Sequence, residues 1–228
     1  MKRYLRYERL SRLNGLGVIV SLALSLVFAP AWASTWTVLL YMAADNELWD
    51  EGLEDLAELQ ETGSTPEVKV IVQTDIRDST AKRLLLERGR ARLIRDLGEL
   101  DSGDPEALAD FGVWAVLRYP SQHYLLIIWD HGNGWFNEIG TAVSQGPAPP
   151  AVHAGIAYDG SSGNSIGVAN GELRGALLEI ASHLGRGIDV LGLDACSMQL
   201  LEVACETGDA AQILVASQAL VPLDGWPY

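Results

Sequence analysis

Two short stretches of the sequence carry residues that can do covalent chemistry. One stretch ends in His131 and the other in Cys196. A thiol becomes a strong nucleophile when a base or a cation stands beside it, and an imidazole can be that base. A His131/Cys196 dyad could therefore attack a carbonyl carbon. The backbone amides of Gly132 and Cys196 could then form an oxyanion hole for acyl transfer.

Each residue of this pair also has a structural interpretation. A cysteine at the end of an apolar strand is commonly a small buried hydrophobic residue. A histidine in a glycine-rich turn commonly has a structural role, and the remaining three histidines, His123, His153 and His183, are interpreted in that way. The joint placement of His131 and Cys196 at two strand ends favours the catalytic interpretation.

The elements that must position the pair are two apolar runs. HYLLIIWD leads into His131, and IDVLGLD leads into Cys196. Continuous apolar runs are typical of strands that are buried on both faces. His131 and Cys196 are 65 residues apart, which is about one strand–loop–helix–strand unit. Neighbouring parallel strands would bring both residues to the carboxyl edge of one sheet, where sites form in such folds.

The rest of the chain alternates strands and helices in the same way. This pattern predicts an α/β fold whose sheet is mostly parallel and is covered on both faces. Residues 136–168 are rich in Gly, Pro, Ser and Ala and predict a long surface segment. The expected strands are 36–42, 68–74, a hairpin of 81–86 with 91–97, 123–130, 188–194 and 213–217, and the expected helices are 48–62, 104–118, 170–183 and 198–207.

The first 33 residues predict a signal peptide. A basic start precedes an uncharged stretch from Leu16 to Ala29, and Ala31-Trp32-Ala33 follows as a small-x-small cleavage site. The alternative is an uncleaved anchor, but the stretch is short for a membrane span of ~20 residues. We expect cleavage before Ser34, no membrane attachment afterwards, and a secreted or periplasmic protein.

Charge and cysteine content exclude several classes of function. The formal net charge is −14, whereas a nucleic-acid partner needs a basic surface. No phosphate-binding glycine loop and no G-x-S-x-G elbow is present. The two cysteines are too few for a disulfide scaffold or a zinc site, and their spacing disfavours a mutual disulfide. We expect no cofactor and no metal.

Four motifs together resemble the clostripain family of cysteine peptidases, which belong to the caspase-like group. The motifs are WTVLLYMAADNELWD, YLLIIWDHGNGW, DVLGLDACSMQLLEVACE and SQALVPLDGWPY, and they span almost all of residues 34–228. The resemblance implies a caspase-like α/β/α sandwich, with His131 as general base and Cys196 as nucleophile. It also implies protein or peptide substrates cleaved after Arg or Lys, and an acidic specificity pocket at Asp194 and Asp224.

The strand pattern supports Asp194 independently. Because side chains alternate along a strand, Asp194 and Cys196 would lie on one face. The alternative is that Asp194 caps the next helix. Calcium dependence occurs in part of the family, but no spaced calcium-binding loop is visible in this sequence.

Two functions from different classes follow. The first is an exported cysteine endopeptidase specific for Arg or Lys. The second is a non-catalytic peptidase-like domain that binds proteins or glycans at the cell surface. Members of the family usually continue well past the position of Tyr228, so we expect residues 34–228 to be a peptidase domain truncated at its C-terminal end.

Overall fold

The computed structural model describes residues 34–135, 155–223 and 225–228. The predicted signal peptide, residues 1–33, lies outside the described residues. Within the described part, no helix is both long and apolar enough to cross a membrane.

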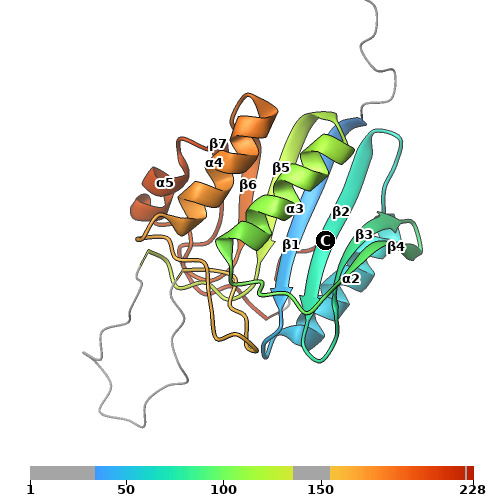
Figure 1. The fold of residues 1–228 in the computed structure, drawn as a ribbon, viewed down its shortest axis with the longest axis horizontal. Coiled ribbons are helices and arrows are strands. Elements are labelled where there is room, and N and C mark those ends of the chain that lie inside the picture. Colours follow the sequence, from blue (N-terminus) through green and yellow to red (C-terminus); the bar gives the residue numbers. More distant parts are fainter. Residues whose placement is uncertain (1–33, 136–154, 224) are drawn as a thin grey trace, which may run out of the picture. The chain divides into compact units, whose positions relative to one another are not determined.

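A seven-stranded sheet forms the centre of the described unit (Figure 1). Its strand order is β4-β3-β2-β1-β5-β6-β7. The pairs formed by β2, β1, β5, β6 and β7 are parallel, whereas β3 is antiparallel to both of its neighbours, β2 and β4. The strands are β1 (Ser34–Ala44), β2 (Val68–Ile76), β3 (Ala81–Glu87), β4 (Arg90–Gly98), β5 (Ser121–Trp129), β6 (Ile188–Asp194) and β7 (Ala211–Val215). The predicted mostly parallel sheet is confirmed.

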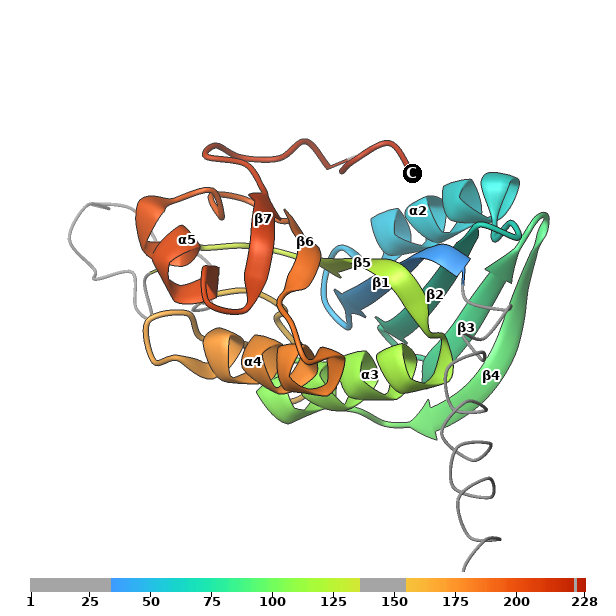
Figure 2. The same cartoon turned by 90° about the horizontal axis from the view of Figure 1, so that it is seen from above.

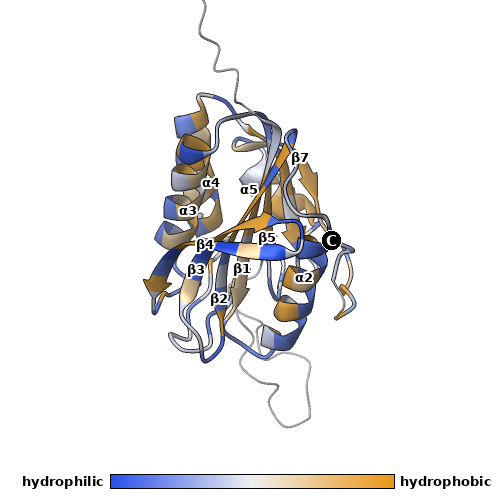
Figure 3. Cartoon of the chain, turned by 90° about the vertical axis from the view of Figure 1, so that its right-hand side faces the viewer, coloured by the Kyte–Doolittle hydropathy of each residue, from blue (hydrophilic) through white to orange (hydrophobic). Residues whose placement is uncertain are grey.

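Helices cover both faces of this sheet (Figure 2). One face carries α3 and α4, and α2 lies on the opposite face together with the last residues of the chain. The helices are α2 (Trp49–Thr62), α3 (Pro105–Arg118), α4 (Glu172–Leu184) and the short α5 (Leu201–Thr207). In Figure 3 these helices carry both hydrophilic and hydrophobic residues, as expected for elements with one buried side.

The core lies in two layers, one on each side of the sheet. Leu39, Leu126 and Ile128 point to the α3/α4 layer, whereas Leu40 and Ile127 point to the α2 layer. Successive residues alternate between the two faces. Both faces of β1 and β5 are therefore buried, which explains why their sequences read as continuous apolar runs.

Helix α3 begins where the sequence predicted it. The Asp104 side chain accepts a hydrogen bond from the Glu106 amide, and Pro105 occupies the first helical position. Helix α5 begins three residues later than expected, because residues 195–197 form a bend and a turn and residues 198–200 are irregular. Strand β7 begins and ends two residues earlier than expected.

Candidate active site

The pairing of β5 with β6 places His131 and Cys196 at the same edge of the sheet. The last paired residues are Trp129 and Asp194, and the Asp130 amide donates to the Asp194 carbonyl at 3.2 Å. His131 and Cys196 follow directly. Together with Asp194 they line one pocket of about 60 Å³. The structure thus brings together three of the residues that the sequence singled out.

Gly132, which follows β5, packs closely against the residues that follow β6. A Cβ atom at this position would lie 2.4 Å from the Cys196 carbonyl oxygen, 2.8 Å from the Ala195 Cβ and 2.9 Å from the Met198 Cγ. Only a residue without a side chain allows this approach. The turn that carries His131 is therefore packed directly on the turn that carries Cys196.

His131 has one charged neighbour. Its Nε2 lies 3.1 Å from Glu47 Oε1, but the two groups are not aligned as a hydrogen bond. The imidazole is 37% exposed and the Glu47 side chain is 65% exposed. Solvent therefore screens the charge of the Glu47 carboxylate.

The turn before His131 is fixed by a buried polar network. The Asp130 carboxylate accepts hydrogen bonds from the His131 amide, the Tyr158 amide and Asn46 Nδ2, the last at 2.8 Å. Asn46 Nδ2 also lies within hydrogen-bonding distance of the Ala43 and Tyr158 carbonyls. Burial raises the pKa of Asp130 well above its ordinary value, although these hydrogen bonds lower it. Asp45-Asn46 belongs to the first of the four motifs, and the sequence assigned it no catalytic role.

Cys196 is half-buried and is not in a disulfide. Its Sγ accepts a hydrogen bond from the Val221 amide at 3.3 Å. Neither the Cys196 amide nor the Gly132 amide has a hydrogen-bond acceptor among the residues that the structure describes. Both amides thus remain able to donate to a ligand. The second cysteine, Cys205, is exposed on α5 and also free.

Asp194 is buried beside Cys196, with 3% of its surface exposed. Its Oδ2 accepts hydrogen bonds from the Trp226 amide at 3.1 Å and from the Tyr228 hydroxyl at 2.8 Å. Burial raises the pKa of Asp194, and both hydrogen bonds oppose that effect. Asp194 does not cap the next helix, since the N-cap position of α5 is Leu200. Asp224, the other predicted specificity residue, lies outside the described residues.

Sequence reasoning missed a second buried acid near the pocket, Asp55 on α2. Asp55 is 4% exposed, and its Oδ2 accepts a hydrogen bond from Trp129 Nε1 at 2.6 Å. The pKa of Asp55 is raised to about 6. Burial is the main cause, the nearby Asp194 adds to it, and the hydrogen bond from Trp129 opposes it. A signal was available in the sequence. Gly52, Asp55 and Leu59 recur at helical spacing, which places Asp55 on the buried stripe of α2.

The described residues contain no group of three or more His, Cys, Asp or Glu side chains that could hold a metal ion. The calcium dependence found in part of the family therefore has no assignable site in this part of the chain. The described pocket is lined by residues that carry a thiol, an imidazole and a buried carboxylate, and Gly132 directly follows its lining residue His131.

Comparison with known proteins gives a consistent result. The sequence model of the clostripain family matches residues 40–228. Clostripain of Hathewaya histolytica is 28% identical over 225 aligned positions, which cover 84% of this chain and 40% of clostripain.

Two solved structures are similar in fold. A secreted C11 cysteine protease from Bacteroides thetaiotaomicron, solved in complex with an irreversible peptide inhibitor, has a TM-score of 0.68 and 25% identity. An inactive zymogen C11 protease from Parabacteroides distasonis has a TM-score of 0.65 and 22% identity. Each comparison covers 86% of this chain and 52% of the other.

These matches confirm the predicted caspase-like α/β/α sandwich. The chain spans about half the length of the relatives, or less. The family model nevertheless covers most of the sequence, in agreement with the four motifs. The chain therefore belongs to the clostripain family of cysteine peptidases.

Proposed function

We propose that this chain is an exported cysteine endopeptidase in which His131 and Cys196 form the catalytic dyad and Asp194 selects Arg or Lys before the scissile bond. The observation that carries the proposal is the contact at Gly132. The missing side chain there lets the His131 turn rest on the Cys196 carbonyl. A thiol and an imidazole are thereby held at the mouth of the same pocket.

The chemistry runs in two stages. His131 takes the proton from the Cys196 thiol, and the thiolate sulfur attacks the carbonyl carbon of the scissile peptide bond. The resulting oxyanion accepts hydrogen bonds from the Gly132 and Cys196 amides. When the C–N bond breaks, the protonated His131 gives its proton to the leaving amine, and a thioester remains on Cys196.

Water completes the cycle. His131 takes a proton from a water molecule, and the water oxygen attacks the thioester carbonyl. The C–S bond then breaks, the acid product leaves, and the sulfur recovers its proton from His131. Atoms and charges balance over the two stages without a cofactor.

Specificity is proposed to come from charge. Asp194 lines the same pocket as the dyad, and both hydrogen bonds that it accepts go to Oδ2. Oδ1 remains for the guanidinium or ammonium group of a substrate. Asp224 is proposed as a second acid of the pocket from the family motif alone.

The test uses short peptides with Arg, Lys, Glu or Leu before the scissile bond. We expect the Arg and Lys peptides to be hydrolysed much faster than the Glu and Leu peptides. Cys196→Ala and His131→Ala should each reduce the rate by several orders of magnitude with little change in thermal unfolding. Cys205→Ala is the matched control and should keep full activity, because this thiol is exposed on α5.

Asp194→Asn tests the specificity. Truncating one partner of a buried charge pair typically costs ~2–5 kcal/mol, so kcat/KM should fall much more for Arg peptides than for neutral ones. Equal losses would assign Asp194 a structural role. If the wild-type protein binds peptides but cleaves none, the chain is instead the non-catalytic binding domain considered above.

Export is the remaining part of the proposal. It is supported by the layout of residues 1–33 and by a solved relative that is described as secreted. Amino-terminal sequencing of protein recovered outside the cytoplasm should give Ser34. Recovery of intact Met1 in the membrane fraction would contradict cleavage.

A further inference from the structure

Two buried carboxylates face the same small space beside Gly225. A Cβ atom built on Gly225 would lie 3.2 Å from Asp194 Oδ2, 3.3 Å from Asp55 Oδ2 and 3.8 Å from Trp129 Nε1. Gly225 has a φ of +60°, a left-handed conformation that favours glycine. Any side chain at this position would meet both acids. The glycine therefore keeps open a space between Asp194, from β6, and Asp55, from α2.

This space adjoins the pocket of the dyad. Gly225, Trp129 and Asp194 all line that pocket, and the Trp129 indole is held by its 2.6 Å hydrogen bond to Asp55. Asp55 is not one of the residues that line the pocket, but it lies next to Trp129 and Gly225, which do. It can act on the pocket through its charge and through the position of the indole, without lining the wall.

Among the described residues, none of the charged or titratable groups around Asp55 is cationic. They are Asp194 from β6, Tyr228 from the terminal segment, and Glu54 and Glu58 from α2 itself. Trp129, from β5, donates its only side-chain hydrogen bond. No ion pair within the described residues uses Asp55 or Asp194. Two buried acids without a counter-ion are costly, and a cation placed between them offsets that cost.

We propose that Asp55 is a specificity-determining positioning residue, which supplies an additional negative charge to the receptor for the basic substrate side chain held by Asp194. This inference rests on the function proposed above and adds to it a residue from the opposite layer of the fold. The ligand class is a guanidinium or primary ammonium group on a flexible chain.

The receptor should depend on pH in a defined direction. Burial and the nearby acids raise the pKa of Asp55 to about 6. Asp55 is therefore neutral below this pH and negative above it, so the preference for basic substrates should rise as pH increases through about 6. The ratio of kcat/KM for an Arg peptide to that for a Leu peptide isolates this effect, because titration of the dyad affects both substrates alike.

The decisive variant is Asp55→Asn in the full chain. The amide oxygen can still accept the Trp129 hydrogen bond, but the negative charge is lost. We expect the Arg/Leu ratio to fall on the order of tenfold at pH 8 and its rise near pH 6 to disappear. Glu61→Gln is the matched control, since it removes the same charge from an exposed position of α2 that is not among the acids around Asp55. It should leave both the ratio and its pH profile as in the wild type.

A binding measurement separates this inference from the proposed peptidase function. Agmatine, a small guanidinium compound, should bind the wild-type protein in calorimetry and bind Asp55→Asn on the order of tenfold more weakly at pH 8. This result would support the receptor even if the wild type hydrolyses no peptide. Equal agmatine affinity in both proteins, or an unchanged Arg/Leu ratio and pH profile in an active Asp55→Asn, would overturn it.

Discussion

The missing side chain of Gly132 is the smallest feature on which the site depends. Gly132→Ala would place a methyl group 2.4 Å from the Cys196 carbonyl oxygen, so one of the two turns must move. A misplacement of about 1 Å can cost on the order of 10²-fold in rate. We expect kcat/KM to fall by about that factor, measured with the best Arg peptide.

The control for this variant is Gly89→Ala in the β3–β4 turn. Gly89 has a positive φ, unlike Gly132, and a Cβ there has no neighbour within 4 Å. The control should lose on the order of 1 kcal/mol of stability and keep its activity. Full activity of Gly132→Ala would show that the close contact does not set the geometry of the dyad.

Asp75, at the end of β2, should make stability fall as pH rises. It is 4% exposed, its Oδ2 has no hydrogen-bond partner among the described residues, and burial raises its pKa to about 7. The folded state therefore holds a proton that the unfolded state releases near pH 4. The stabilisation is complete below about pH 4 and is lost as pH rises to 7, by about 4 kcal/mol in total.

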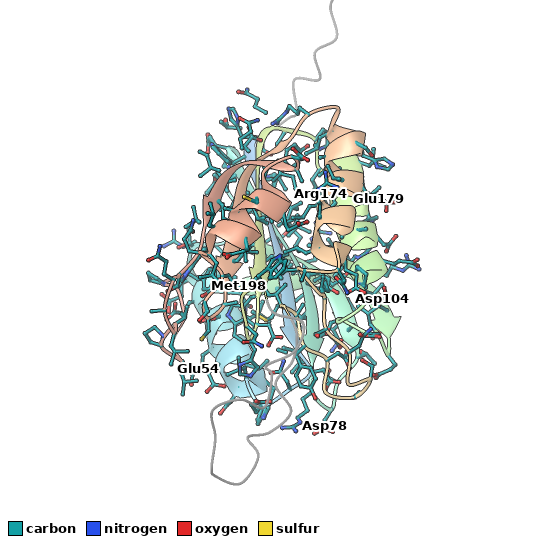
Figure 4. All side chains as sticks on the ribbon, turned by 90° about the vertical axis from the view of Figure 1, so that its left-hand side faces the viewer. Glu54, Asp78, Asp104, Arg174, Glu179 and Met198 are labelled. Atoms are coloured by element: carbon teal, nitrogen blue, oxygen red, sulfur yellow. The ribbon has the colours of Figure 1, made fainter. Side chains whose placement is uncertain are left out.

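Asp75→Asn should remove this dependence. Unfolding midpoints measured from pH 4 to pH 8 should change less in the variant than in the wild type, and the variant should be the more stable protein at pH 8. Asp78→Asn is the control, because Asp78 is exposed a few residues further on (Figure 4). The same slope in the wild type and in Asp75→Asn would refute the assignment.

Some individual residues could be predicted from the sequence and others could not. The strand ends at His131 and Cys196 were predictable, since apolar runs lead directly into them. Arg83 was not, because a strand pattern gives no reason to bury a guanidinium. In the structure Arg83 is 2% exposed, bonded to Gln73 and Asp110 and stacked 4.5 Å from the Trp114 ring centroid. Such partners come from other elements and become visible only in the folded chain.

At the scale of elements, α3 and α4 touch through a glycine. A Cβ at Gly112 of α3 would lie 2.2 Å from Ile180 Cδ1 of α4. Gly112→Ala should therefore lose about 1–3 kcal/mol through overpacking, although alanine is the better helix former. Chemical denaturation would measure the loss.

Gly175 of α4 provides the opposite case. It is exposed, and a Cβ there has no neighbour within 4 Å. Gly175→Ala should therefore gain about 0.5–1 kcal/mol from helix propensity alone. If both substitutions stabilised the protein, the two helices would not be in close contact at Gly112.

Element boundaries were predictable where a local signal exists. Asp104-Pro105 gives such a signal for α3, and the structure uses both residues as expected. The start of α5 has none. The amides of Ser197 and Gln199 instead donate hydrogen bonds to the segment after β7. Their acceptors are the carbonyls of Ala219, at 3.0 Å, and Ser217, at 2.8 Å. Long-range hydrogen bonds of this kind leave no periodic trace in the sequence.

At the scale of the whole molecule, we predict that the protein does not cleave its own chain between His131 and Cys196. Family members often process themselves after a basic residue in this region, but residues 136–168 contain no Lys or Arg. Arg174 lies inside α4 and pairs with Asp209 at 2.6 Å. Arg186 is bonded to Asp189 and to the Gln122 carbonyl. Neither residue can enter an active site without local unfolding.

Intact mass measures this directly. The wild-type protein and Cys196→Ala should keep the same mass across this region after prolonged incubation. A break between residues 136 and 168 in the wild type alone would refute the prediction and would show that cleavage is not restricted to basic residues.

The side-by-side pairing of β5 and β6 has one more consequence. The pairing from Leu125↔Val190 to Trp129↔Asp194 sets the spacing of the dyad, and 58 residues separate the two strands along the chain. β5 is also bonded to β1, and β6 to β7. The protein could thus be made as two separate polypeptides, divided between the strands, and the sheet would reassemble them with the thiol and the imidazole in place. An enzyme expressed in that divided form should recover its activity on mixing.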